Sequence, residues 1–157
     1  MTRKSYSVPA KDEAVTAALG QCIAPILKPG DTILLEGPVG AGKTHFARSL
    51  IQSILVEQED VPSPSFTLVQ TYETTKGPLW HCDLYRLGRS DVDDLGLDEA
   101  FETAICLIEW PDRLEELTPD HALRVRFDTS DASGPRLNVF EWTSDRWSVL
   151  ESLLPHV

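Results

Sequence analysis

The sequence is poor in cysteine and has no long apolar run. Its three cysteines, Cys22, Cys82 and Cys106, are widely spaced and form no CxxC pair, so neither a disulfide framework nor a zinc site is indicated. No run approaches the roughly 20 apolar residues of a membrane span, and the N-terminal residues lack a signal-peptide pattern. We therefore expect reduced, partly buried thiols in a soluble, cytoplasmic protein that does not associate with membranes.

Positive charge is also scarce. The 157 residues include 14 Lys and Arg against 25 Asp and Glu, a net charge of −11, and 11 acidic but only 2 basic residues lie between Arg89 and Asp120. Such a surface repels a phosphate backbone, so direct binding of nucleic acid by this chain alone is not expected. The acidic side chains from Asp91 to Glu102 are either a solvated face or a docking surface for a basic partner.

A complete GxxxxGKT phosphate loop directly follows Thr32–Glu36, an apolar run with the length of a strand. A strand that leads through a glycine-rich turn into a helix aims backbone N–H groups and a positive helix end at phosphate. We expect the lysine to bind the phosphates and the threonine hydroxyl to bind Mg²⁺. The alternative is a glycine-rich turn without a ligand. The loop positions expected to bind the nucleotide are Gly37, Pro38, Val39, Gly40, Ala41, Gly42, Lys43 and Thr44.

Apolar spacing along the rest of the chain predicts alternating strands and helices in a single domain, residues 1–157. The predicted fold class is α/β, a P-loop NTPase-type three-layer fold with a mixed parallel and antiparallel central sheet. Helices are expected at Asp12–Leu27, Lys43–Leu55, Asp91–Thr103 and Ser144–Leu154. Besides Thr32–Glu36, strands are expected at Tyr6–Val8, Thr67–Glu73, Leu79–Tyr85, Ile105–Ile108, Leu123–Phe127 and Leu137–Trp142, the last two forming a hairpin around residues 131–135.

Two carboxylates follow strand candidates and could serve a triphosphate site. Glu109 ends the apolar run at Ile105–Ile108 and is our first choice as a Mg²⁺ ligand, because P-loop enzymes place a carboxylate at the end of a buried strand. Asp83 is the better candidate to orient or deprotonate the attacking group, or to support the metal shell. Alternatively, Glu109 caps a following helix and Asp83 pairs with Arg86. His81 is either catalytic or a structural imidazole.

The chain resembles the TsaE family, also called YjeE, in four motifs that occur in order. These are the phosphate loop, Ser63–Val69 (SPSFTLV), His81–Leu87 (HCDLYRL) and Ile108–Pro111 (IEWP). The resemblance implies an ATPase, weak on its own, that is needed to make threonylcarbamoyladenosine in tRNAs reading codons that begin with A. It also implies TsaB and TsaD as protein partners and ATP with Mg²⁺ as cofactors. With the net charge of −11, the chain is expected to act on tRNA only through those partners.

The resemblance also implies roles for individual residues. Lys43, Asp83 and Glu109 would be the catalytic groups, with Thr44 and Glu109 as the metal ligands. Trp110 would pack near the nucleotide, and the segment from Ala10 to Glu13 would border the adenine. A nucleotide-sensitive switch loop would contain Ser63, Ser65 and Thr67.

Two other functions use the same groups. A P-loop small-molecule kinase would need an arginine-bearing lid, for which Arg86 and Arg89 are candidates, with Asp83 as base. A nucleotide-gated binding module without significant turnover would need only the nucleotide site.

Overall fold

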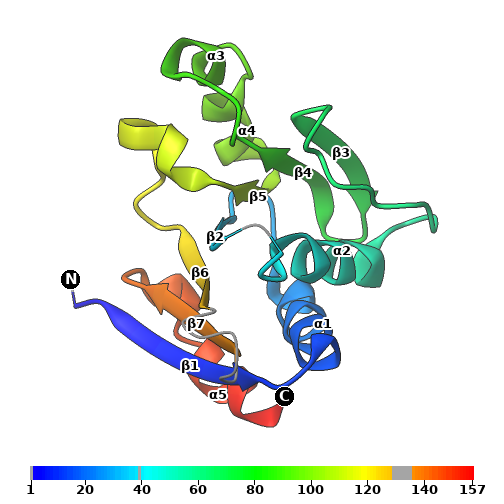
Figure 1. Ribbon diagram of the computed structural model, residues 1–157, viewed down its shortest axis with the longest axis vertical. Coiled ribbons are helices and arrows are strands. Elements are labelled where there is room, and N and C mark those ends of the chain that lie inside the picture. The colour runs from blue at the N-terminus through cyan, green and yellow to red at the C-terminus, as the bar shows by residue number, and fades with distance from the viewer. Residues whose placement is uncertain (1, 39, 129–135) are drawn as a thin grey trace.

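One mixed sheet runs through the chain. The computed structural model describes residues 2–38, 40–128 and 136–157, and Val39 and the predicted turn at 131–135 lie outside them. Within this part the strand order is β1-β7-β6-β2-β5-β4-β3, as Figure 1 shows. The strands are β1 (Lys4–Ala10), β2 (Thr32–Glu36), β3 (Val69–Thr74), β4 (Gly77–Asp83), β5 (Ile105–Glu109), β6 (Leu123–Asp128) and β7 (Arg136–Trp142).

The four central strands are parallel and the flanking strands are antiparallel. Strand β2 pairs in parallel with β5 and β6, and β4 pairs in parallel with β5. The pairs β1–β7, β6–β7 and β3–β4 are antiparallel, so the predicted mixed sheet is confirmed. Because parallel strands end at one edge of a sheet, the residues that follow β2, β4 and β5 are brought together there.

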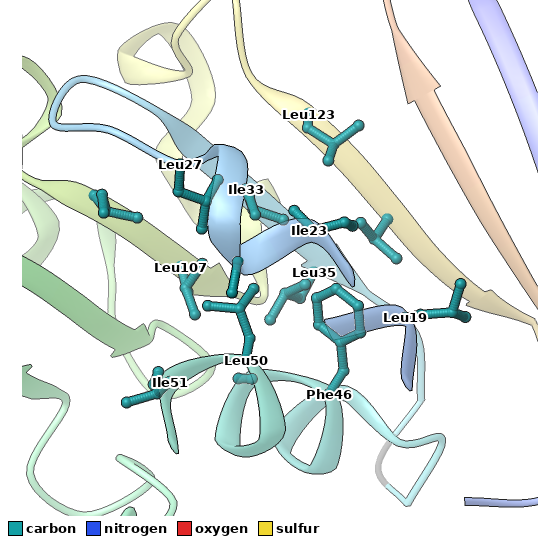
Figure 2. Close-up of a cluster of buried hydrophobic side chains, with 14 of the residues drawn as sticks. Leu19, Ile23, Leu27, Ile33, Leu35, Phe46, Leu50, Ile51, Leu107 and Leu123 are labelled. Carbon is teal, nitrogen blue, oxygen red and sulfur yellow. The ribbon is translucent and has the colours of Figure 1, made fainter. Parts of the chain in front are cut away.

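Helices cover both faces of this sheet. The longer ones are α1 (Glu13–Ile23) and α2 (Lys43–Ile54), and the shorter ones are α3 (Arg89–Asp93), α4 (Leu97–Thr103) and α5 (Leu150–Leu153). Leu19 and Ile23 of α1 form one apolar cluster with Phe46, Leu50 and Ile51 of α2 and with Leu35 of β2. Figure 2 shows Phe46 and Leu50 directed toward Leu35. A second apolar cluster joins α3 and α4 to the opposite face and includes Leu34 of β2 and Ile108 of β5. The resulting architecture has three layers.

Three of the predicted helices are shorter or broken in the structure. Asp12 caps α1 rather than belonging to it, and a 3₁₀ turn, η1 (Ala24–Ile26), containing Pro25 follows the helix. The predicted helix Asp91–Thr103 is two helices, since Gly96 adopts a left-handed conformation with φ 77° between them. The predicted helix Ser144–Leu154 consists of η3 (Asp145–Trp147), α5 and η4 (Leu154–His156). Within the described residues, no helix has both the length and the apolar character needed to span a bilayer.

An ion pair between partly exposed Arg146 and buried Asp31 fixes the loop that leads into β2. Asp31 is 2% exposed, and its carboxylate accepts hydrogen bonds from Arg146 at 2.9 and 2.7 Å and from the Lys28 backbone N–H at 2.9 Å. Arg146 also donates to the Ile26 carbonyl. The segment after β7 therefore holds the start of the strand that carries the phosphate loop.

The three cysteines are free, and two of them are fully buried. Cys82 and Cys106 lie on the adjacent strands β4 and β5. Burial raises the pKa of Cys82 well above its ordinary value and raises the pKa of Cys106 to about 12. Both side chains are neutral thiols in the folded protein near neutral pH.

These thiols predict a loss of stability at alkaline pH. In the unfolded chain Cys106 ionises near its ordinary pKa of 9.0, whereas in the folded protein it stays protonated up to about 12. The contribution of Cys106 to the free energy of unfolding is therefore fully present below its pKa in the unfolded chain. It is lost, at about 1.4 kcal/mol per pH unit, as the pH rises toward its pKa in the folded protein. Urea unfolding at about pH 8 and about pH 10 measures this loss, which Cys106→Ala should reduce by about 1 kcal/mol. An equal loss in both proteins would contradict the prediction.

Candidate functional site

The phosphate loop joins the end of β2 to the start of α2 and depends on its glycines. Gly37 has φ 147°, and a Cβ there would lie 2.7 Å from the Phe127 carbonyl oxygen. Gly42 is the N-cap of α2 in a left-handed conformation with φ 108°, and its carbonyl accepts the Phe46 N–H at 2.9 Å. Side chains at either position would be strained, so both positions require glycine.

Lys43 is held across the inside of this loop. It is 5% exposed, and its Nζ donates to the Gly37 carbonyl at 2.5 Å and lies 3.7 Å from the centre of the Trp110 ring. Burial lowers the pKa of Lys43, while the carboxylates of Glu109, Asp83 and Asp112 oppose that shift. The ammonium is therefore kept next to the loop and among carboxylates.

Trp110 connects Lys43 to the segment after β4. Its ring lies 4.7 Å from that of Tyr85, centre to centre, and its backbone has φ 60°, which is unusual for a bulky residue. This conformation turns the chain directly after Glu109, so that the indole reaches the lysine.

Glu109 lies next to Thr44 at the end of β5. It is 3% exposed, and the Thr44 hydroxyl lies 3.2 Å from Oε1 and 3.4 Å from Oε2. Oε2 is also 2.7 Å from Nε2 of His81. The next helical segment, η2 (Pro111–Leu117), has Trp110 at its N-cap and no side-chain cap bond. The alternative in which Glu109 caps that segment is therefore wrong.

Asp83 lies beside Glu109, because the two are register partners on β4 and β5. It is 7% exposed, and its carboxylate accepts the Tyr85 N–H at 3.0 Å and the Ser65 hydroxyl at 3.3 Å. In the contacts of the described residues Arg86 does not pair with Asp83, and its guanidinium lies 5.3 Å from the centre of the Phe66 ring. The alternative of an ion pair with Arg86 is therefore wrong, and a neighbouring loop orients the Asp83 carboxylate instead.

Only part of the predicted switch loop lies next to the Asp83 carboxylate. The hydroxyls of Ser63 and Ser65 share a hydrogen bond of 2.7 Å, and the Ser65 hydroxyl donates to the Asp83 carboxylate. Thr67 is exposed, and its hydroxyl accepts from the Gln70 side chain at 2.8 Å. Of the three residues, Ser65 has the direct contact with the site.

A cavity of about 290 Å³ opens between these groups. A second hollow of about 420 Å³ shares Glu13, His45, Gly40 and Gly42 with it and extends toward the start of α1. His45 of α2 borders both and contacts the Glu13 carbonyl at 3.1 Å; no sequence motif singles it out. The first cavity is lined by Glu13, Gly40, Gly42, Lys43, Thr44, His45, Ser65, Asp83, Glu109 and Trp110.

The donor atoms at the first cavity suit a magnesium ion. Thr44 supplies a hydroxyl and Glu109 a carboxylate, and Mg²⁺ prefers oxygen ligands. Among the described residues, no group of three or more His, Cys, Asp or Glu side chains is arranged to hold a metal. The chain thus offers Mg²⁺ a site that phosphate and water oxygens would have to complete.

Comparison with known proteins gives one consistent family. Residues 10–137 match the family model described as threonylcarbamoyl adenosine biosynthesis protein TsaE. The chain is 37% identical to a Rickettsia felis protein over 121 residues, which is 76% of this chain and 71% of that protein. It is 39% identical to a Bacillus subtilis protein over 111 residues, 70% of this chain and 69% of that protein. Both relatives are named tRNA threonylcarbamoyladenosine biosynthesis protein TsaE.

A solved structure agrees over nearly the whole length. The crystal structure of Bacillus subtilis YdiB matches with a TM-score of 0.80 and 31% identity, covering 99% of this chain and 98% of that one. The phosphate loop and the residues facing it lie within the matched segment. By sequence and by fold, this chain belongs to the TsaE family of threonylcarbamoyladenosine biosynthesis proteins.

Proposed function

We propose that this chain is a Mg²⁺-dependent ATPase that sustains threonylcarbamoyladenosine formation in tRNAs reading codons that begin with A. The observation that carries this proposal is the convergence of Lys43, Thr44, Asp83 and Glu109 on one cavity at the end of the parallel strands. The loop supplies N–H groups and an ammonium for phosphate, and the facing strands supply carboxylates.

Each group has a separate task in this ATPase. Lys43 would leave the Gly37 carbonyl to pair with phosphate oxygens, and the Thr44 hydroxyl and Glu109 carboxylate would hold Mg²⁺. The bound metal would supply neutralisation of charge on the phosphates. Asp83 accepts a hydrogen bond from the attacking water and orients it, which is consistent with its place beside Glu109 and under Ser65. Glu13 and the hollow beside it accommodate the adenosine end.

Partner proteins transmit the effect of the nucleotide. In this proposal the partners are TsaB and TsaD, and the activity is cytoplasmic. Six exposed acidic side chains on α3, its C-cap residue and α4 form one candidate contact region: Asp91, Asp93, Asp94, Asp98, Glu99 and Glu102. Phe66 is 84% exposed and directly follows Ser65, whose hydroxyl donates to Asp83. A shift of Ser65 relative to Asp83 would therefore move an apolar side chain on the surface. The net charge of −11 favours contact with proteins over direct contact with tRNA.

Reconstitution with purified TsaB, TsaD and substrate tRNA tests the function. We expect many threonylcarbamoyladenosine products per TsaD only when this chain and hydrolysable ATP are both present, with faster phosphate release when TsaB and TsaD are added. Full turnover with a non-hydrolysable analogue would favour a nucleotide-gated module. Transfer of phosphate to a small acceptor would favour a kinase.

A further inference from the structure

His81 is a fully buried imidazole placed against the proposed metal ligand. It lies on β4, two residues before Asp83, and is 0% exposed. Its register partner on β5 is Leu107, while Asp83 pairs with Glu109. Paired residues and alternate residues of a strand share a face, so His81 and Glu109 are diagonal neighbours on the face that carries the phosphate loop. Their Nε2 and Oε2 atoms are 2.7 Å apart.

The hydrogen bonds around this imidazole identify which nitrogen carries the proton. A carboxylate only accepts hydrogen bonds, so Nε2–H of His81 donates to Glu109. Nδ1 is buried and has no partner among the described residues, which suits a bare lone pair better than an N–H group. The tautomer is thus assigned from its contacts.

Glu109 has little else to fix its orientation. It is 3% exposed, and among the described residues the other hydrogen bond to its carboxylate comes from Thr44, whose hydroxyl lies within 3.4 Å of both oxygens. Since Thr44 is itself a proposed metal ligand, its hydroxyl would be shared between the metal and Glu109. His81 is the partner of Glu109 that is not itself a proposed metal ligand.

We propose that His81 is a positioning residue that holds Oε2 of Glu109 and thereby presents Oε1 to the metal. This inference rests on the proposed function for its metal and adds a residue to that site. Groups that hydrogen-bond to a metal-ligating carboxylate orient it, and their loss typically weakens metal binding by roughly 10- to 100-fold. We expect a clear effect here, because the protein ligands proposed among the described residues are Thr44 and Glu109 alone, and no group of three or more His, Cys, Asp or Glu side chains there could hold the metal.

Substitutions that differ in reach provide the test. In His81→Gln the side-chain amide extends to about the position of Nε2 and can donate to Glu109, whereas in His81→Asn it stops near Nδ1. Calorimetric titration of ATP at a series of Mg²⁺ concentrations should give a roughly 10- to 100-fold higher Mg²⁺ requirement for Asn, and a requirement near wild type for Gln. ATP affinity in excess EDTA should be the same in all three proteins.

A control separates positioning from general damage to the core. Cys82→Ala removes another fully buried side chain from β4, on the opposite face of the sheet, and should leave the Mg²⁺ requirement unchanged. Equal Mg²⁺ requirements in the Gln, Asn and wild-type proteins would overturn the role of His81 while leaving the ATPase proposal intact. A wild-type protein that binds ATP equally with and without Mg²⁺ would contradict both the role of His81 and the proposed Mg²⁺-dependent ATPase.

Discussion

Replacing Lys43 with methionine is expected to weaken ATP binding by roughly 100-fold or more, because a charge-assisted hydrogen bond in a buried site contributes about 3 kcal/mol. Among the described residues, Lys43 is the only lysine or arginine that lines the first cavity. The nearby carboxylates of Glu109, Asp83 and Asp112 favour its charged form. Without the ammonium, the carboxylates would repel a triphosphate. Fluorescence or calorimetric titration with Mg·ATP measures the loss.

The same substitution should not destabilise the ligand-free protein. Burial lowers the pKa of Lys43, which means that the folded state disfavours its charged form. Methionine keeps an apolar chain against the Trp110 ring and removes the buried charge. Urea unfolding should therefore give an unchanged or higher free energy of unfolding. The control is Lys76→Ala in the turn between β3 and β4, which should alter neither the affinity for Mg·ATP nor the free energy of unfolding. A Lys43 variant that binds Mg·ATP as the wild type does would contradict the proposed site.

Replacing Glu109 with glutamine is expected to lower the rate of ATP hydrolysis by roughly 100- to 1,000-fold, the range found when a group that stabilises charge in a transition state is removed. The amide has nearly the size of the carboxylate but is a poorer ligand for Mg²⁺. Its NH₂ group also cannot accept the hydrogen bond from His81. Phosphate release under saturating Mg·ATP measures the effect.

The affinity for ATP without metal should not fall in Glu109→Gln. Glu109 places negative charge beside Lys43, so its neutralisation should leave ATP affinity in EDTA unchanged or make it tighter. Glu109→Asp is the informative second variant, since a side chain shorter by one methylene cannot keep its present contacts with both Thr44 and His81. Its rate should lie between those of the wild type and Glu109→Gln. Hydrolysis by Glu109→Gln at the wild-type rate would exclude the carboxylate from the metal site.

Local pattern was sufficient for the parts of the site that are neighbours in sequence. The glycines, lysine and threonine of the loop lie within eight residues, and their spacing alone predicts a strand, a turn and a helix. The uninterrupted apolar run before Glu109 likewise predicts a buried strand, and β5 is buried at every position. The helix predictions were less accurate in α3–α4 and after β7, where short helices that depend on tertiary contacts replace longer periodic ones.

Side-chain partners could not be predicted in the same way. The sequence left Glu109 with a capping role as an alternative and Asp83 with Arg86 as a partner, because both rivals are near in sequence. Register decided against them by placing Glu109 beside Asp83 and diagonal to His81. A shift of one residue would have turned these side chains to the other face of the sheet.

The sequence by itself therefore determined that this chain has a phosphate loop between a strand and a helix in an α/β fold, since those features arise from residues that are close along the chain. Only the tertiary structure decided several contacts between distant side chains: Lys43 with Trp110, Glu109 with His81, and Arg146 with Asp31. The physical reason is that strand order and register set these contacts, and both depend on how the whole core packs.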